Sequence, residues 1–166
     1  MVEIKLDGRL SYSKNRDIAL ALLSRVRKMG GKWVLGITSS SLTFFDMDSM
    51  EERVARKVCT RLSEIAGKEV HAFTTGTGYH FVIITNKKER DRIYKDVLSD
   101  PFLSEVLDTL YIEIALEKGT STLRISSKPW SNKPPPKYVF SCNKDKFFVI
   151  KELVGEGGSG AGEQTH

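Results

Sequence analysis

The stretch Leu42-Thr43-Phe44-Phe45-Asp46-Met47-Asp48-Ser49 decides how the rest of the chain is interpreted. Residues two apart on an extended strand point to the same face, so Asp46 and Asp48 face one way while Phe45 and Met47 face the other. Two carboxylates on one face repel each other unless a cation lies between them, and hard oxygen ligands suit Mg²⁺ or Mn²⁺. The alternative is a strand end whose acids cap the next helix, because so short a motif is weakly specific.

The composition describes one globular domain. The 166 residues are 40% hydrophobic and 28% charged, which is ordinary for a globular protein large enough to bury a core. No apolar run approaches the roughly 20 residues that a membrane span needs, and residues 1–10 are too polar for a signal peptide. We therefore expect an intracellular, cytoplasmic protein with no membrane partner. The formal net charge of +5 is compatible with a polyanionic partner.

The cysteine and histidine content excludes a zinc module. Only two cysteines occur, Cys59 and Cys142, and with three histidines no zinc-finger or zinc-ribbon spacing can be written. We expect reduced thiols and no disulfide framework.

The hydrophobic patterns predict an α/β fold of the α+β type, with a mixed, mostly antiparallel sheet flanked by helices. Residues 1–154 form the single expected domain, and the Gly/Ser/Ala/Glu-rich residues 155–166 are expected to be disordered. Helices are predicted over residues 14–29, 49–67, 87–98 and 100–110. Strands are predicted over residues 32–38, 41–48, 68–74, 79–85, 111–116, 121–127, 137–142 and 146–153, with a short strand or arm within 1–12.

Two local features sharpen this prediction near the paired acids. The turn at Ser39-Ser40 indicates a hairpin between strands 32–38 and 41–48. Ser49 followed by Glu52 matches a capping box at the start of the next helix. The exposed face of that helix carries basic side chains, which are either solvated or in contact with nucleic acid.

Three further segments carry side chains suited to phosphate or metal binding. In the Gly-rich turn that leads to His80, the hydroxyl of Thr75 and the backbone N–H groups can hold a phosphate. Strand alternation places Glu113 opposite an apolar face, where it is either a further metal ligand or a solvent-facing acid. Arg124, Ser126 and Lys128 share one face of the predicted strand 121–127 and its continuation, a run of donors that suits a triphosphate.

The order of these segments resembles the archaeo-eukaryotic primase superfamily. Its first motif matches Phe44-Phe45-Asp46-Met47-Asp48-Ser49, and its second matches Thr75-Gly76-Thr77-Gly78-Tyr79-His80. Its third looks like Glu113-Ile114-Ala115-Leu116 followed by Thr122-Leu123-Arg124-Ile125-Ser126-Ser127-Lys128. The resemblance spans roughly residues 32 to 130. The chain has Glu113 where the family usually has Asp, Thr75 where a serine is common, and no zinc-binding cluster.

The resemblance implies a minimal primase-polymerase catalytic core with an RRM-like fold. Asp46, Asp48 and Glu113 would hold two Mg²⁺ or Mn²⁺ ions and be the catalytic residues. The phosphates of the incoming nucleotide would be held by Thr75, His80, Arg124, Ser126 and Lys128. The implied partners are nucleoside triphosphates, a single-stranded DNA template or primer-template, and an accessory replication subunit.

The implied activity is that of a template-dependent nucleotidyltransferase, a DNA primase or polymerase that makes or extends short primers. Two metals can clamp the attacking 3′-hydroxyl and the leaving pyrophosphate while basic donors neutralise the developing charge. Two other readings stay open. One is a catalytically inactive nucleic-acid or nucleotide-binding module with the same fold, and the other is a metal-dependent nuclease, because paired acids also serve phosphodiester hydrolysis.

Overall fold

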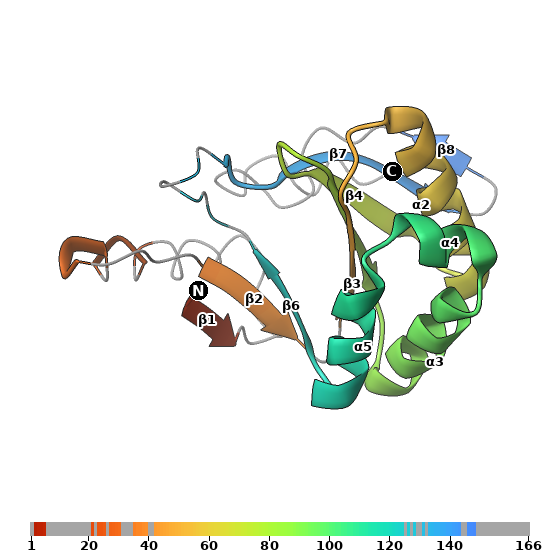
Figure 1. Ribbon diagram of the computed structural model, residues 1–166, viewed down its shortest axis with the longest axis horizontal. Coiled ribbons are helices and arrows are strands. Elements are labelled where there is room, and N and C mark those ends of the chain that lie inside the picture. The colour runs from red at the N-terminus through yellow and green to blue at the C-terminus, as the bar shows by residue number, and fades with distance from the viewer. Residues whose placement is uncertain are drawn as a thin grey trace.

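Five strands of the chain form one antiparallel sheet in the order β3-β5-β4-β7-β8 (Figure 1). The computed structural model describes residues 2–5, 21, 23–25, 27–30, 35–39, 42–124, 126, 128, 131, 133–143 and 146–148. In spatial order the strands are β3 (Leu42–Met47), β5 (Tyr79–Ile84), β4 (Val70–Thr74), β7 (Lys137–Asn143) and β8 (Lys146–Phe148). The predicted fold, a mostly antiparallel sheet with flanking helices, is confirmed at this level.

A second, smaller sheet contains three strands. They are β1 (Val2–Lys5), β2 (Leu35–Ser39) and β6 (Ser121–Arg124). The central strand β2 runs parallel to β1 and antiparallel to β6. In Figure 1, β2 and β6 lie on one side of the large sheet and the helices α2, α3 and α4 lie on the other.

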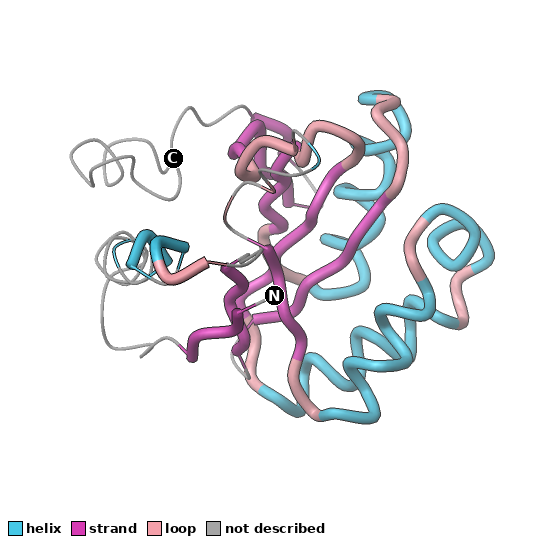
Figure 2. Tube along the Cα trace, turned by 60° about the vertical axis from the view of Figure 1, so that its left-hand side comes forward, coloured by secondary structure: helices cyan, strands magenta, loops and turns pink. Residues whose placement is uncertain are grey.

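Four helices are described in full. They are α2 (Glu52–Ala66), α3 (Lys87–Leu98), α4 (Pro101–Val106) and α5 (Thr109–Lys118). Within the predicted helix 14–29, residues 21, 23–25, 27 and 28 are helical, and they lie across the strands from these four helices in Figure 2. The rest of that segment and residues 155–166 lie outside the described part of the chain. None of the helices described here is long and apolar enough to cross a membrane.

The main core lies between the large sheet and its helices. Apolar residues of β3 and β5 that are paired in the strand register point to the same face of the sheet. Phe45 pairs with Phe81 and Met47 with Tyr79, and their side chains are buried with those of Val58 and others from the helices. Apolar burial of this kind is the dominant favourable term in folding. Since successive strand residues alternate in direction, the same register sends Asp46 and His80 to the face away from the helices.

Helix α2 has the predicted C-terminus but not the predicted capping box. Gly67 ends the helix in the left-handed conformation, at φ 65°, which glycine adopts without steric cost. At the other end the N-cap is Glu51, with no side-chain cap, and the Ser49 hydroxyl instead accepts a bond from the Glu51 N–H at 3.2 Å. The capping-box prediction is wrong because the helix begins too late for Ser49 to reach its N3 position.

Residues 111–116, predicted to be a strand, are part of helix α5. The Asp108 side chain accepts a hydrogen bond from the Tyr111 N–H at one end, and Gly119 ends the helix in the left-handed conformation. Ile112 and Ala115, three apart, are the buried positions, while Ile114 is exposed. An alternating run of Ile and Leu over six residues also fits a helix, so its two caps decide the structure and the alternation does not.

The predicted hairpin between residues 32–38 and 41–48 is also wrong. The strand β2 has both of its edges occupied, by β1 and β6. The strand β3 therefore pairs with β5 in the other sheet. The chain between them passes from one sheet to the other, so closeness in the sequence does not produce pairing here.

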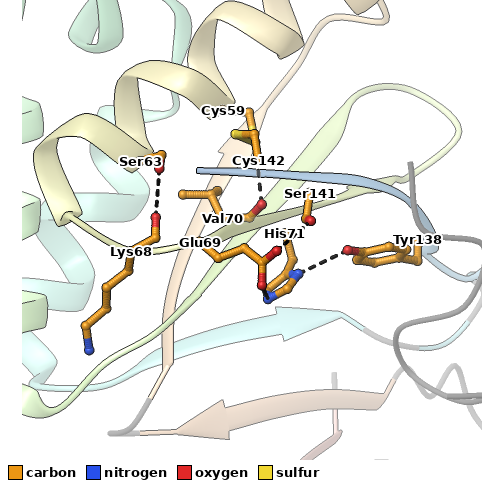
Figure 3. Close-up of a disulfide and its surroundings, with 9 residues drawn as sticks. All are labelled: Cys59, Ser63, Lys68, Glu69, Val70, His71, Tyr138, Ser141 and Cys142. Atoms are coloured by element: carbon orange, nitrogen blue, oxygen red, sulfur yellow. Dashed lines mark hydrogen bonds and ion pairs between the residues drawn. A yellow bond between two sulfur atoms is a disulfide. The ribbon is translucent and has the colours of Figure 1, made fainter. Parts of the chain in front are cut away.

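The expectation of free thiols is corrected by a disulfide between Cys59 of α2 and Cys142 of β7 (Figure 3). Both cysteines are fully buried, and Cys59 Sγ lies 3.5 Å from the carbonyl oxygen of Val70 on β4. The bridge ties the helix to β7 of the large sheet across 83 residues of sequence. Two cysteines far apart in sequence give no signal of this pairing, because connectivity follows from the fold.

We predict that breaking this bridge destabilises the fold. A cross-link that closes a long loop restricts the unfolded chain and contributes about 2–5 kcal/mol to stability. Urea unfolding of the oxidised protein should show a higher midpoint than unfolding in dithiothreitol. The Cys59→Ala/Cys142→Ala variant is the control, since its midpoint should not respond to the reductant. Equal midpoints for the wild type with and without reductant would contradict the prediction.

Candidate functional site

Asp46 and His80 face each other across the pairing of β3 with β5. They are direct partners in the strand register, and His80 Nε2 lies 3.3 Å from Asp46 Oδ1. The His80 side chain is 12% exposed and that of Asp46 is 28% exposed, so both are accessible from the face away from the main helices. When the imidazole is protonated the contact is an ion pair. The predicted proximity of the first and second motifs is therefore present in the fold.

Asp48 lies just beyond the end of β3 and is exposed. The Gly-rich turn packs against this segment at Gly78. A Cβ atom added to Gly78 would lie 1.9 Å from the Met47 carbonyl oxygen and 3.3 Å from the Asp48 Cα. Only glycine permits so close an approach, so the turn and the acidic segment are held against each other by backbone contact.

The turn itself is closed by reciprocal hydrogen bonds between Thr75 and Gly78. The Thr75 N–H donates to the Gly78 carbonyl oxygen, and the Gly78 N–H donates to Thr75 Oγ1, each at 3.0 Å. Thr75 is buried, and Gly76 has φ 88°, where an added Cβ atom would lie 2.9 Å from Pro134 Cδ. The oxygen of the predicted phosphate-binding Thr75 is thus already an acceptor within the turn, which leaves its proton as the group available to a ligand.

Arg124 lies at the end of β6, beside β3. Its guanidinium donates to the Ser126 carbonyl oxygen and, at 2.8 Å, to that of Pro134. Burial lowers the pKa of Arg124, and the nearby Asp46 carboxylate acts in the opposite direction. Arg124 therefore belongs to the same cluster as Asp46 and His80, and it remains a cation because an arginine pKa is very high.

The other two predicted phosphate ligands follow β6. Ser126 is buried and Lys128 is half-buried. The Lys128 N–H donates to the Lys133 carbonyl oxygen at 2.9 Å, which folds the proline-containing loop back on itself. Phosphate binding by Ser126 and Lys128 stays a prediction.

Glu113 does not occupy the position expected of it. It is exposed on α5, not on a strand beside the two aspartates. The acid next to Asp46 is instead Asp108, whose backbone N–H donates to the Asp46 carbonyl oxygen at 2.9 Å. Its carboxylate caps α5 by accepting from the Tyr111 N–H at 3.1 Å. An Asp placed before a helix that ends at Gly119 was the signal that could have identified this residue.

Tyr111 fixes the start of α5 against β6. Its hydroxyl donates to the Thr122 carbonyl oxygen at 2.5 Å. Burial raises the Tyr111 pKa, and the charges of Tyr94 and Asp46 raise it further. The neutral phenol therefore adds no charge near Asp46, while the Tyr111 backbone N–H bonds the Asp108 carboxylate.

The carboxylates of the cluster are not gathered around one point. Among the described residues, no three His, Cys, Asp or Glu side chains lie close enough to form a metal site. The Asp46 carboxylate lies beside His80, and that of Asp108 accepts a hydrogen bond at the α5 N-terminus. His80 Nδ1 is buried and has no hydrogen-bond partner in the described part of the structure, so the imidazole retains a polar atom for a ligand.

Comparisons with known proteins add no assignment. No protein-family model matches the chain, and no curated protein or solved structure matches it.

We predict that Gly78→Ala separates the turn from the acidic segment. The new methyl group would overlap the Met47 carbonyl oxygen, and overpacking of this kind costs about 1–3 kcal/mol. The midpoint of urea unfolding should fall accordingly. Thr77→Ala changes an exposed residue of the same turn and should leave the free energy of unfolding within about 0.5 kcal/mol of the wild-type value. A Gly78→Ala midpoint equal to that of Thr77→Ala would show that the close approach is unimportant.

Proposed function

We propose that the protein is a template-dependent nucleotidyltransferase that makes or extends short primers on single-stranded DNA. The observation that carries the proposal is the convergence on Asp46 of three other segments. His80 contacts its carboxylate, Asp108 bonds its backbone, and Arg124 lies within range of its charge. These acidic and basic groups come from the three sequence motifs that resemble the primase superfamily, with Asp108 preceding the third.

In this proposal Asp46, Asp48 and Asp108 hold the divalent ions. Three carboxylates supply the hard, anionic oxygens that Mg²⁺ and Mn²⁺ prefer. The bound ions supply Lewis-acid activation of the 3′-hydroxyl and neutralisation of the leaving pyrophosphate. Asp108 replaces Glu113 as the third acid, because its backbone already contacts that of Asp46 whereas Glu113 is exposed further along α5.

The basic side of the site would bind the nucleoside triphosphate. Arg124 retains guanidinium N–H groups beyond those that bond Pro134 and Ser126, and a planar fork of donors matches phosphate oxygens. His80, released from Asp46 when that carboxylate turns to an ion, would donate to a phosphate oxygen. Thr75, Ser126 and Lys128 would add a hydroxyl proton, a second hydroxyl and a point charge. Catalysis is then positioning plus electrostatic stabilisation, with no protein nucleophile.

One observation favours a second candidate, a catalytically inactive nucleotide-binding or nucleic-acid-binding module. Asp46 is paired with His80, and the described acids do not surround a common point. Such a protein would bind nucleotide or template without metal-dependent incorporation. A metal-dependent nuclease is distinguished by degradation of a labelled strand in place of its extension.

We predict that Asp108 and not Glu113 is required for nucleotide incorporation. Asp108→Asn keeps the helix cap, because Asn caps as well as Asp, and removes only the charge. Loss of a metal ligand should raise the barrier by several kcal/mol, which is more than about a 100-fold loss of rate. The measurement is incorporation of labelled nucleotide on a primed single-stranded template with Mg²⁺ or Mn²⁺.

The matched variant is Glu113→Gln, which removes one charge from the exposed face of the same helix and should keep near wild-type activity. Asp46→Asn provides the inactive reference. Loss of activity in Glu113→Gln, with activity retained in Asp108→Asn, would show that Glu113 and not Asp108 is the third metal ligand. Equal incorporation by the wild type and Asp46→Asn would exclude the proposed activity.

A further inference from the structure

A surface hollow is lined by residues of α2 and α4. Both helices lie on the side of the large sheet that faces away from β6 (Figure 1). The volume of the hollow is about 490 Å³. The lining residues are Arg56, Lys57, Thr60, Arg61 and Glu64 of α2 and Phe102 of α4. Three of these six side chains are cationic and one is acidic, so the hollow has a basic rim.

Two cations of the rim, Lys57 and Arg61, present donors to an anionic partner, whereas Arg56 pairs with Glu52 and lies over the Phe140 ring. Lys57 is exposed. Arg61 bonds Asp100 at 2.7 Å and lies 3.5 Å from Glu64, yet its side chain is 48% exposed. Because a guanidinium has five N–H donors, these contacts leave donors directed to the solvent. The bond to Asp100, which itself caps α4, fixes the guanidinium in place at the rim.

The basic rim continues along α2 towards the paired acids. Arg53, Lys57 and Arg61 are four residues apart, so they form one stripe on the helix surface about 12 Å long. Arg53 is exposed and follows Asp48 by only five residues. Arg53, in the first turn of α2, is therefore the member of the stripe nearest in sequence to the acidic segment at the end of β3.

Phe102 supplies an aromatic wall. It is half-buried and packed against the main core, while part of its side chain lines the hollow. A ring held rigidly by the core next to cationic side chains is the combination on which nucleic-acid bases stack in single-strand binding proteins.

We propose that this hollow binds single-stranded nucleic acid, with the phosphates along the Arg53–Lys57–Arg61 stripe and one base stacked on Phe102. The choice of nucleic acid over an acidic peptide rests on the proposed function. The hollow would hold the part of a template strand that has left the site around Asp46.

The test is fluorescence anisotropy of a labelled oligothymidylate with the full chain over a range of salt concentrations. Lys57→Glu should weaken binding about tenfold or more and make the salt slope shallower by at least about 0.7, the value for one phosphate contact on a single strand. Phe102→Leu should weaken binding about tenfold with an unchanged salt slope, because stacking is lost and charge is not. The urea midpoint of each variant identifies any loss of folding, and the exposed Lys57 is not expected to cause one.

Lys88→Glu is the matched control. Lys88 is exposed in the first turn of α3, outside the hollow, and its reversal changes the net charge of the protein by the same amount. An equal loss of oligothymidylate affinity in Lys57→Glu and Lys88→Glu would overturn the proposal, since binding would then follow net charge alone. Competition by polyglutamate at the same charge concentration, or no binding by the wild type at low salt, would also overturn it.

Failure of the hollow and failure of the proposed activity are separable. Asp46→Asn should lose incorporation and keep oligothymidylate binding if the hollow acts as proposed. Loss of binding in Asp46→Asn with wild-type binding in Lys57→Glu would place the nucleic acid at the acid site instead.

Discussion

The pairing of β3 with β5 in a single register is the constraint on which the candidate site depends. It places Phe45 opposite Phe81 and Met47 opposite Tyr79 towards the helices, and Asp46 opposite His80 towards the other face. A slip of one residue would send the acid into the core and the aromatic rings to the solvent. The burial of the apolar face therefore fixes the position of the polar pair, and packing energy organises a site that contributes little stability of its own.

The remaining parts of the site are brought to β3 by backbone contacts. Gly78 lies against Met47 and Asp48, and the Asp108 N–H bonds the Asp46 carbonyl oxygen. Tyr111 joins the start of α5 to β6, which carries Arg124. The backbones of Asp46 and Asp108 are therefore in direct contact, while the Asp46 carboxylate contacts His80 and the Asp108 carboxylate accepts from the Tyr111 N–H.

Strong periodicity made much of this fold predictable from the sequence. The apolar run from Tyr79 to Ile84 is typical of a buried strand and forms β5. The helix α3 has the predicted bounds, residues 87–98. Two of the errors come from contacts distant in sequence, because the partner of β2 and the Cys59–Cys142 bridge are decided by neighbours that a local pattern does not contain. The helical state of residues 111–116 follows instead from the caps Asp108 and Gly119, which lie just outside the alternating run. The error in the third acid follows from this one, because Glu113 was assigned to a strand that does not form.

The proposed activity requires Asp46, Asp48 and Asp108 to form a divalent-cation site beside Arg124, which a crystal structure of the protein with Mn²⁺ and a nucleoside triphosphate would reveal. We expect manganese anomalous density about 2 Å from carboxylate oxygens of Asp46 and Asp108, with the His80–Asp46 contact opened and the triphosphate on Arg124. Manganese bound elsewhere, or a site in which Asp46 still contacts His80 and Asp108 still caps α5, would contradict it.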